Sequence, residues 1–242
     1  MNKRFVWAMA CAIIPAVMTH AMQPSDKDKD NGIPSVVWGA RIGFAATSTY
    51  MTDIFIDGHS MSEYTQDTQV GNFASLQLRL NSKRLLFQTG VGLSLNKSSF
   101  IIDKNSWDEE SGSRNEMTYS YSMKSLLVPV QIGYHFVNQP PYSMSVFTGP
   151  RLRYIPDKYY TVEYSNLAPA PYQFSESPNN LIMGWTLGLS IQIGRTFLDF
   201  EYEATISKVT RGMYATNESE PDPNYRLDRR VGIISFSYGI MF

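Results

Sequence analysis

Hydrophobic and polar residues alternate along most of the chain in stretches of about ten residues. In the stretch 181–194, Trp185, Leu187 and Leu189 occupy every second position, and Thr186 and Ser190 lie between them. A period of two is typical of a β-strand with two different faces. About ten residues is also the length of a tilted strand that crosses a membrane. The pattern therefore predicts an all-β fold.

Eight such stretches follow one another, at 36–50, 70–81, 85–96, 118–136, 143–155, 181–194, 197–208 and 230–242. Short connections follow the second, fourth and sixth stretches, and long connections follow the others. This arrangement predicts an eight-stranded antiparallel up-and-down transmembrane β-barrel, with short turns and both termini in the periplasm and long loops outside. Pro129 and Pro150 fall inside strands and lack the N–H that a ladder needs, so we expect bulges at both.

The two faces of the predicted strands differ in polarity. One face carries large apolar residues and almost no charge, whereas the other carries Arg, Gln and Glu among Gly, Ser and Thr. A soluble barrel would have to enclose all the large residues in an interior that ordinary side chains already fill. Outward aromatic residues such as Trp38, Tyr154 and Trp185 gather near strand ends, as membrane girdles do. The pattern favours a barrel in the outer membrane over a secreted soluble one.

Charged residues on the inward face predict an ion-pair cluster inside the barrel, made of Arg41, Arg151, Arg153, Glu201 and Glu203. Charges enclosed by a narrow barrel must be paired. Counting from the short turns places Arg41, Glu201 and Glu203 at similar depth, together with Gln77 and Gln131. We therefore expect Arg41 and Arg151 to pair with Glu201 and Glu203. An eight-stranded barrel is just filled by its own side chains, so the cluster should close the lumen to solutes.

The two ends of the chain carry export and assembly features. Residues 1–21 have the basic, apolar and small-residue regions of a signal peptide, and the polar segment 22–35 should be a flexible periplasmic leader. The barrel domain is then 36–242. The only cysteine, Cys11, lies in the signal, so the mature chain forms no disulfide. The last strand ends with an outward row that resembles an assembly signal read by the barrel-assembly machinery, namely Phe236, Tyr238, Ile240 and Phe242.

Composition changes this picture little. The chain has 242 residues, of which 43% are hydrophobic, and this suits one barrel domain. Its formal net charge of -1 gives no global field that would attract nucleic acid, so no nucleic-acid partner is expected.

Residues that could carry chemistry are few. His59 lies in the first long connection beside Asp57 and Ser60, and His135 lies near the periplasmic end of a strand. Proximity along a loop is weak evidence for a catalytic triad. The acidic segment 103–110 lacks the regular spacing and glycine of a calcium loop. We therefore predict no enzyme activity, no cofactor and no metal site.

The third long connection is unusually aromatic, and its aromatic residues are Tyr159, Tyr160, Tyr164, Tyr172 and Phe174. Such residues can form a binding surface, or they can pack over the mouth of the barrel. The sequence leaves both possibilities open.

Several blocks resemble the PorT-like outer-membrane β-barrel family. They are Leu-Leu-Val-Pro-Val at 126–130, Tyr-His-Phe at 134–136, Phe-Thr-Gly-Pro at 147–150, Gly184 with Leu-Gly-Leu at 187–189, Leu-Asp-Phe-Glu-Tyr at 198–202 and Tyr-Gly-Ile-Met-Phe at 238–242. The resemblance implies a small outer-membrane barrel without a shared known reaction, and some relatives are linked to protein secretion.

Together these features predict a non-enzymatic outer-membrane barrel with a plugged polar interior and long extracellular loops that serve binding, structural or secretion-related roles. Its expected partners are outer-membrane lipid, the barrel-assembly machinery and a protein of the periplasm or cell exterior. The alternatives are a narrow pore for small solutes and a barrel hydrolase that acts on lipid.

Overall fold

The computed structural model describes residues 36–56, 59–60, 64–82, 84–103, 116–156, 160–166, 174–215 and 226–242. The predicted signal peptide and leader lie outside these residues. No helix in the described part of the chain is long and apolar enough to cross a membrane.

Eight long strands build the wall of the molecule. They are β1 (Val36–Ile56), β4 (Gln69–Ser82), β5 (Leu85–Asp103), β6 (Glu116–Gln139), β7 (Tyr142–Tyr154), β10 (Leu181–Ile193), β11 (Thr196–Thr205) and β13 (Arg226–Met241). Five shorter strands lie in the long connections, namely β2 (His59–Ser60), β3 (Tyr64–Asp67), β8 (Tyr160–Asn166), β9 (Phe174–Pro178) and β12 (Thr210–Ala215).

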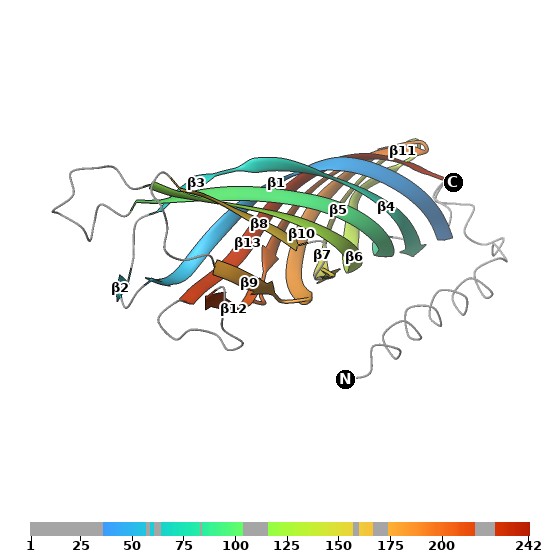
Figure 1. Cartoon of the computed structure of the whole chain (residues 1–242). Helices are drawn as coiled ribbons and strands as arrows, with labels where there is room; N and C mark the ends of the chain where they lie inside the picture. Colours follow the sequence, from blue (N-terminus) through green and yellow to red (C-terminus); the bar gives the residue numbers. More distant parts are fainter. Residues whose placement is uncertain are drawn as a thin grey trace.

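The eight long strands form a closed antiparallel barrel (Figure 1). Each strand pairs with the next in the order β1, β4, β5, β6, β7, β10, β11 and β13, and β13 returns to β1. The closing seam runs from the pair Gly39–Met241 to the pair Phe55–Arg226. Closure leaves no free edge in the wall, so its backbone groups can be satisfied without water. The predicted eight-stranded barrel is confirmed.

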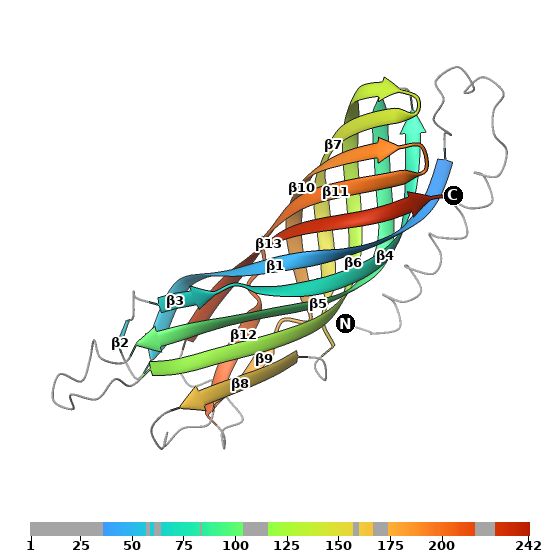
Figure 2. The same cartoon turned by 90° about the horizontal axis from the view of Figure 1, so that it is seen from above.

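Three of the wall strands are much longer than a membrane crossing requires. β1, β5 and β6 have 21, 19 and 24 residues, and they continue beyond the barrel at the end opposite the short turns (Figure 2). There β3 pairs with β5 and β8 pairs with β6, while β9 and β12 form a separate two-stranded sheet.

The long connections were predicted as loops, and in these places that prediction is wrong. The extended edges of β5 and β6 expose backbone donors and acceptors, and β3 and β8 satisfy them.

Side chains alternate between the two faces of the wall, as the pattern predicts. Ile42, Phe44 and Leu93 point outward and are each 67% exposed, whereas Arg41 and Glu201 point inward and are 6% and 1% exposed. The barrel is therefore apolar outside and polar inside, the reverse of a soluble barrel.

The predicted bulges at Pro129 and Pro150 are wrong. The register between β5 and β6, between β6 and β7, and between β7 and β10 continues across both prolines without a shift. Threonine hydroxyls supply hydrogen bonds beside them, since Thr89 Oγ1 donates to the Pro129 carbonyl at 2.9 Å and Thr148 Oγ1 donates to the Thr186 carbonyl at 2.8 Å. The ladder therefore loses proline N–H groups without inserting an extra residue. The shift that does occur in β6 lies between His135 and Val137.

Candidate functional site

The lumen contains an alternating row of acidic and basic side chains, here called the ion ladder. Its three acids occupy alternate positions of β11, so all of them point inward. Its arginines come from β1, β4 and β7, none of which pairs with β11, so they reach the acids through the lumen. The members are Asp199, Glu201 and Glu203 with Arg41, Arg79, Arg151 and Arg153, and each is at most 6% exposed.

The half of the ion ladder nearer the short turns is centred on Arg41. Its Nη1 lies 3.0 Å from Asp199 Oδ2 and also contacts Glu201 Oε1. Arg79 lies on the other side of Asp199, with Nη2 4.0 Å from Oδ1. Arg41 therefore bridges two acids, and Asp199 lies between two arginines.

The other half is centred on Arg151. Its Nη2 contacts Glu201 Oε2, and its Nη1 lies 3.1 Å from Glu203 Oε2. Arg153 Nη2 completes the row, 3.0 Å from the same Glu203 oxygen. The charges therefore alternate in sign from Arg79 to Arg153, and each of the three acids contacts two arginines.

Neutral side chains also accept hydrogen bonds from Arg41 and Arg153. Arg41 Nε donates to Ser75 Oγ at 3.0 Å. Arg153 Nη1 donates to Ser125 Oγ at 2.8 Å, to Asn96 Oδ1 at 3.1 Å and to Ser94 Oγ at 3.2 Å. Buried guanidinium groups need such partners because water cannot reach them.

Two residues expected at the depth of the acids make other contacts. Gln131 accepts from Gln88 Nε2 at 2.7 Å and donates to Thr186 Oγ1 at 2.6 Å. Gln77 Nε2 lies 3.9 Å from the sulfur of Met241. Neither glutamine bonds to the ion ladder, and Gln131 belongs instead to a neutral hydrogen-bonded group with Gln88 and Thr186.

Inward glycines give room for large aromatic rings between the polar groups. A Cβ on Gly188 would lie 2.3 Å from Cζ of Phe147, and a Cβ on Gly239 would lie 2.2 Å from Cζ of Phe197. Phe147 and Phe197 are each 1% exposed. The two rings therefore lie directly against glycine backbone inside the barrel.

The structure brings together all five residues predicted for the interior cluster, Arg41, Arg151, Arg153, Glu201 and Glu203. The prediction missed Asp199 and Arg79 as members. Their inward parity was visible in the sequence, but parity alone does not tell which inward residues on different strands share a depth.

The row predicted as an assembly signal lies on the outer face of the last strand. Phe236, Tyr238, Ile240 and Phe242 are 51%, 53%, 39% and 53% exposed. The Phe242 ring stacks on Trp38 with 4.5 Å between the ring centroids. This row therefore faces the surroundings of the barrel at the seam between β13 and β1.

The residues of the predicted aromatic surface fall partly in the described strands β8 and β9. Tyr159 and Tyr172 lie outside the described residues. The backbones of Tyr160 and Tyr164 belong to β8, and that of Phe174 belongs to β9. β8 runs alongside β6, with Tyr164 paired to Tyr119.

A serine, a histidine and an asparagine meet near the short turns. His135 Nδ1 lies 3.0 Å from Ser143 Oγ, and His135 Nε2 lies 3.1 Å from Asn81 Oδ1. Ser143 and His135 are only 5% and 2% exposed. Sequence reasoning missed this group because its members lie on β4, β6 and β7. The other candidate histidine, His59, lies in β2.

Comparisons with known proteins agree with a barrel of this kind. The family described as outer membrane protein beta-barrel domain matches residues 25–211. No curated protein matches the sequence significantly.

Among solved structures, OprG of Pseudomonas aeruginosa is 10% identical, with 86% of this chain and 96% of that one covered and a TM-score of 0.45. Neisserial surface protein A is 12% identical, with coverage of 85% and 97% and a TM-score of 0.38. Ail of Yersinia pestis is 13% identical, with coverage of 86% and 99% and a TM-score of 0.33.

The family match covers most of the chain, and the closed wall exposes an apolar outer face. The protein therefore belongs to the outer membrane protein β-barrel domain family and is an integral barrel of the outer membrane.

Proposed function

We propose that this protein is a non-enzymatic, PorT-like barrel that does not conduct solutes and that carries a binding or secretion-related surface on its long strands outside the membrane. The short turns and both termini face the periplasm in this orientation, because bacterial barrels have short periplasmic turns and long outer connections.

The observation that carries the proposal is the ion ladder. Seven charged side chains from β1, β4, β7 and β11 meet inside the barrel and leave almost no charged surface accessible to water. An eight-stranded barrel is just wide enough for its own side chains, and these are among the largest. A pore would need smaller inward residues at this depth.

The extension of β1, β5 and β6 supports the second part of the proposal. These strands continue beyond the part of the wall that has an apolar outer face. There β5 pairs with β3, and β6 pairs with β8 (Figure 2). Long paired strands hold a surface more rigidly than a loop does, which lowers the entropy lost on binding a partner.

Conductance in planar lipid bilayers tests the closed lumen. We expect no channel activity from the unmodified protein. A variant with Arg41→Ser, Arg151→Ser and Glu201→Ser removes three large side chains at the centre of the ion ladder and should conduct small ions. Steady conductance by the unmodified protein would overturn the proposal.

Photo-crosslinking in intact cells tests the binding surface. A crosslinker placed at Tyr164 in β8 should capture a discrete partner, whereas one at the exposed Tyr142, near a short turn, should not. Identical product patterns from the two positions would argue against a partner on the extension.

Lipid hydrolysis is a second candidate function, favoured by the contacts of His135 with Ser143 and Asn81. A serine next to a histidine is the arrangement that activates a nucleophile. The burial of Ser143 and His135 weighs against access of an ester. We therefore expect no release of fatty acid from phospholipid micelles, and Ser143→Ala should be indistinguishable from the unmodified protein. Activity that is abolished by Ser143→Ala would establish the hydrolase instead.

A further inference from the structure

Two lysines stand next to each other on the outer face of the wall. Lys97 of β5 and Lys124 of β6 are both exposed, and both have the outward parity of their strands. Leu95 pairs with Lys124 and Lys97 pairs with Ser122, so the two lysines occupy neighbouring rungs of one strand pair. This places two positive charges together on a face whose neighbouring outward residues are mostly apolar.

Their depth corresponds to the outer border of the membrane. Lys97 is twelve positions from the outward Leu85, and Lys124 is twelve positions from the outward Phe136, both near the short turns. With a rise of about 3.3 Å per residue and a tilt of about 40°, twelve residues span roughly 30 Å along the barrel axis. The hydrocarbon core is about as thick. The two amines therefore lie at headgroup level.

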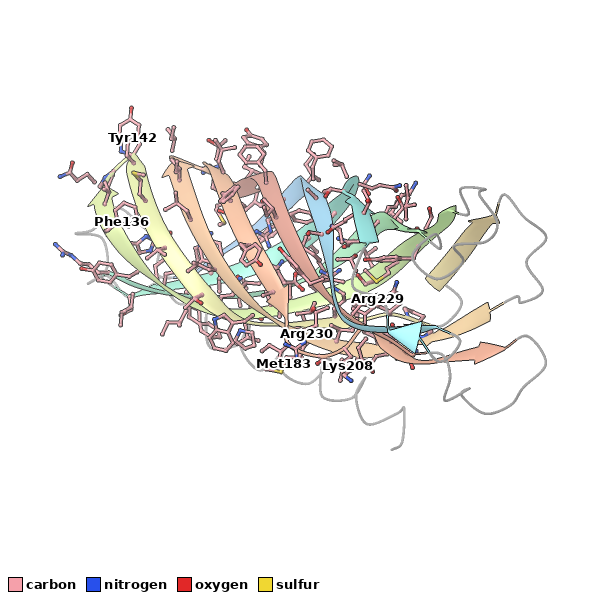
Figure 3. The ribbon with its side chains drawn as sticks, turned by 90° about the vertical axis from the view of Figure 1, so that its left-hand side faces the viewer. Phe136, Tyr142, Met183, Lys208, Arg229 and Arg230 are labelled. Atoms are coloured by element: carbon pink, nitrogen blue, oxygen red, sulfur yellow. The ribbon has the colours of Figure 1, made fainter. Side chains whose placement is uncertain are left out.

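Basic residues of other parts of the wall also lie toward this outer border of the membrane. Arg230 is twelve positions from Phe242 and is exposed. Figure 3 shows Phe136 and Tyr142 at one end of the barrel, with Lys208 and Arg230 toward the other. Lys208 forms an ion pair with Asp228. Lys124, in contrast, lines a mostly apolar hollow in the outer face, and Lys97 lies one rung beyond it.

The hollow has a volume of about 900 Å³ and is lined along two adjacent rungs of the wall. One rung joins Tyr238, Ile42, Ala74, Leu93 and Leu126, and the next joins Phe236, Phe44, Asn72, Leu95 and Lys124, so Asn72 and Lys124 are the polar members of a lining that is otherwise apolar along these rungs. Its exposed lining side chains include Ile42 and Leu93, so it opens on the outer face. At β4 the hollow is lined by the small side chain of Ala74, which lies between the larger Ile42 and Leu93.

We propose that this hollow binds a phosphorylated glycolipid of the outer leaflet, with an acyl chain in the hollow and a phosphate against Lys97 and Lys124. Arginine and lysine at headgroup level attract anionic groups, and the apolar lining suits a hydrocarbon chain. A second copy of the chain fits less well, because the same face of each copy would bring the lysines toward one another. The proposal rests on the orientation given under the proposed function.

Native mass spectrometry of the purified protein with added lipid A tests the site. The double variant Lys97→Ala with Lys124→Ala should bind bisphosphorylated lipid A about tenfold more weakly, since charge-assisted contacts are lost. Ala74→Trp keeps both charges but fills the hollow, and it should also weaken binding. Arg195→Ala removes an exposed cation at the periplasmic turn and serves as the matched control.

Three further ligands separate the possible sources of the anion. Lipid A without phosphates should bind about as weakly to the unmodified protein as intact lipid A binds to the double lysine variant. Inorganic phosphate should not compete, because the acyl chain contributes to affinity. Equal affinity of the double lysine variant and the unmodified protein for lipid A would overturn the proposal, and so would a preference for phosphatidylglycerol, which would place this border in the inner leaflet. Either result leaves the conductance test of the closed lumen unaffected.

Discussion

Trp38 and Phe242 stack at the seam where the first and last wall strands meet, with 26° between their ring planes. The backbone N–H of Phe242 donates to the carbonyl of Trp38 at 2.8 Å. The last residue of the chain is thus joined to the start of the first strand by both its ring and its backbone. Phe242, the residue after β13, therefore adds a ring stack and a backbone hydrogen bond to the closing seam.

Removal of Phe242 should lower the amount of barrel that inserts into the membrane. The variant loses the stack on Trp38 and the final backbone bond of the seam, and aromatic pairs contribute about 0.5–1.5 kcal/mol beyond their buried area. Quantitative immunoblotting of outer-membrane fractions measures the effect. Deletion of Asp28 in the polar leader is the control, and equal insertion of the two variants would contradict the role of Phe242.

Arg41 and Glu201 should be energetically coupled. Arg41→Ala leaves Asp199 and Glu201 short of a buried partner, which typically costs about 3–5 kcal/mol. The double variant Arg41→Ala with Glu201→Gln should lose less unfolding free energy than the two single variants lose in sum, because each single change already removes the contact between the two side chains. Urea unfolding in detergent micelles gives the cycle, with the exposed Arg195→Ala as a neutral reference. Strict additivity would mean that the two side chains do not interact.

Gly188→Ala should destabilise the barrel by about 1–3 kcal/mol because the new methyl group would overlap the buried Phe147 ring. Phe147→Leu in the same background shortens the opposing side chain and should recover part of that loss. Thermal unfolding followed by circular dichroism measures both variants. No recovery in the double variant would show that the ring of Phe147 is not the source of the cost.

The closed wall should resist detergent. We expect the folded protein to migrate faster on a denaturing gel when unheated than after boiling, because a closed ladder has no edge from which unfolding begins. A triple variant with Asp199→Asn, Glu201→Gln and Glu203→Gln should convert to the slow form at a lower temperature. A single band under all conditions for the unmodified protein would be incompatible with this expectation.

The sequence predicts the wall well because lipid restricts one face of every strand. Ile42, Phe44 and Leu93 must be apolar, and their period fixes the strands and their faces. Beyond the part of the wall that has an apolar outer face this restriction ends, which explains why the extension of β5 to Asp103 and the strands β3 and β8 were missed.

The ion ladder could be predicted only in part for a different reason. Parity shows that Asp199 and Arg79 point inward, but their contact also depends on the stagger between β4 and β11, which lie on opposite sides of β1 and β13. The contact of His135 with Ser143 and Asn81 depends on the same stagger. Sequence spacing carries no direct signal for it.

All three acids of the ion ladder belong to one strand, β11, which is synthesised after β1, β4 and β7. Until β11 joins, the strands made earlier bring four arginines toward one another with no acid of the ion ladder between them, and their mutual repulsion opposes a compact intermediate. A shorter six-stranded barrel without the β10–β11 hairpin would keep every arginine and lose every acid. The charge pattern thus links the fold to the order of assembly. The barrel wall can close around its interior only when β11, the next-to-last wall strand, is in place.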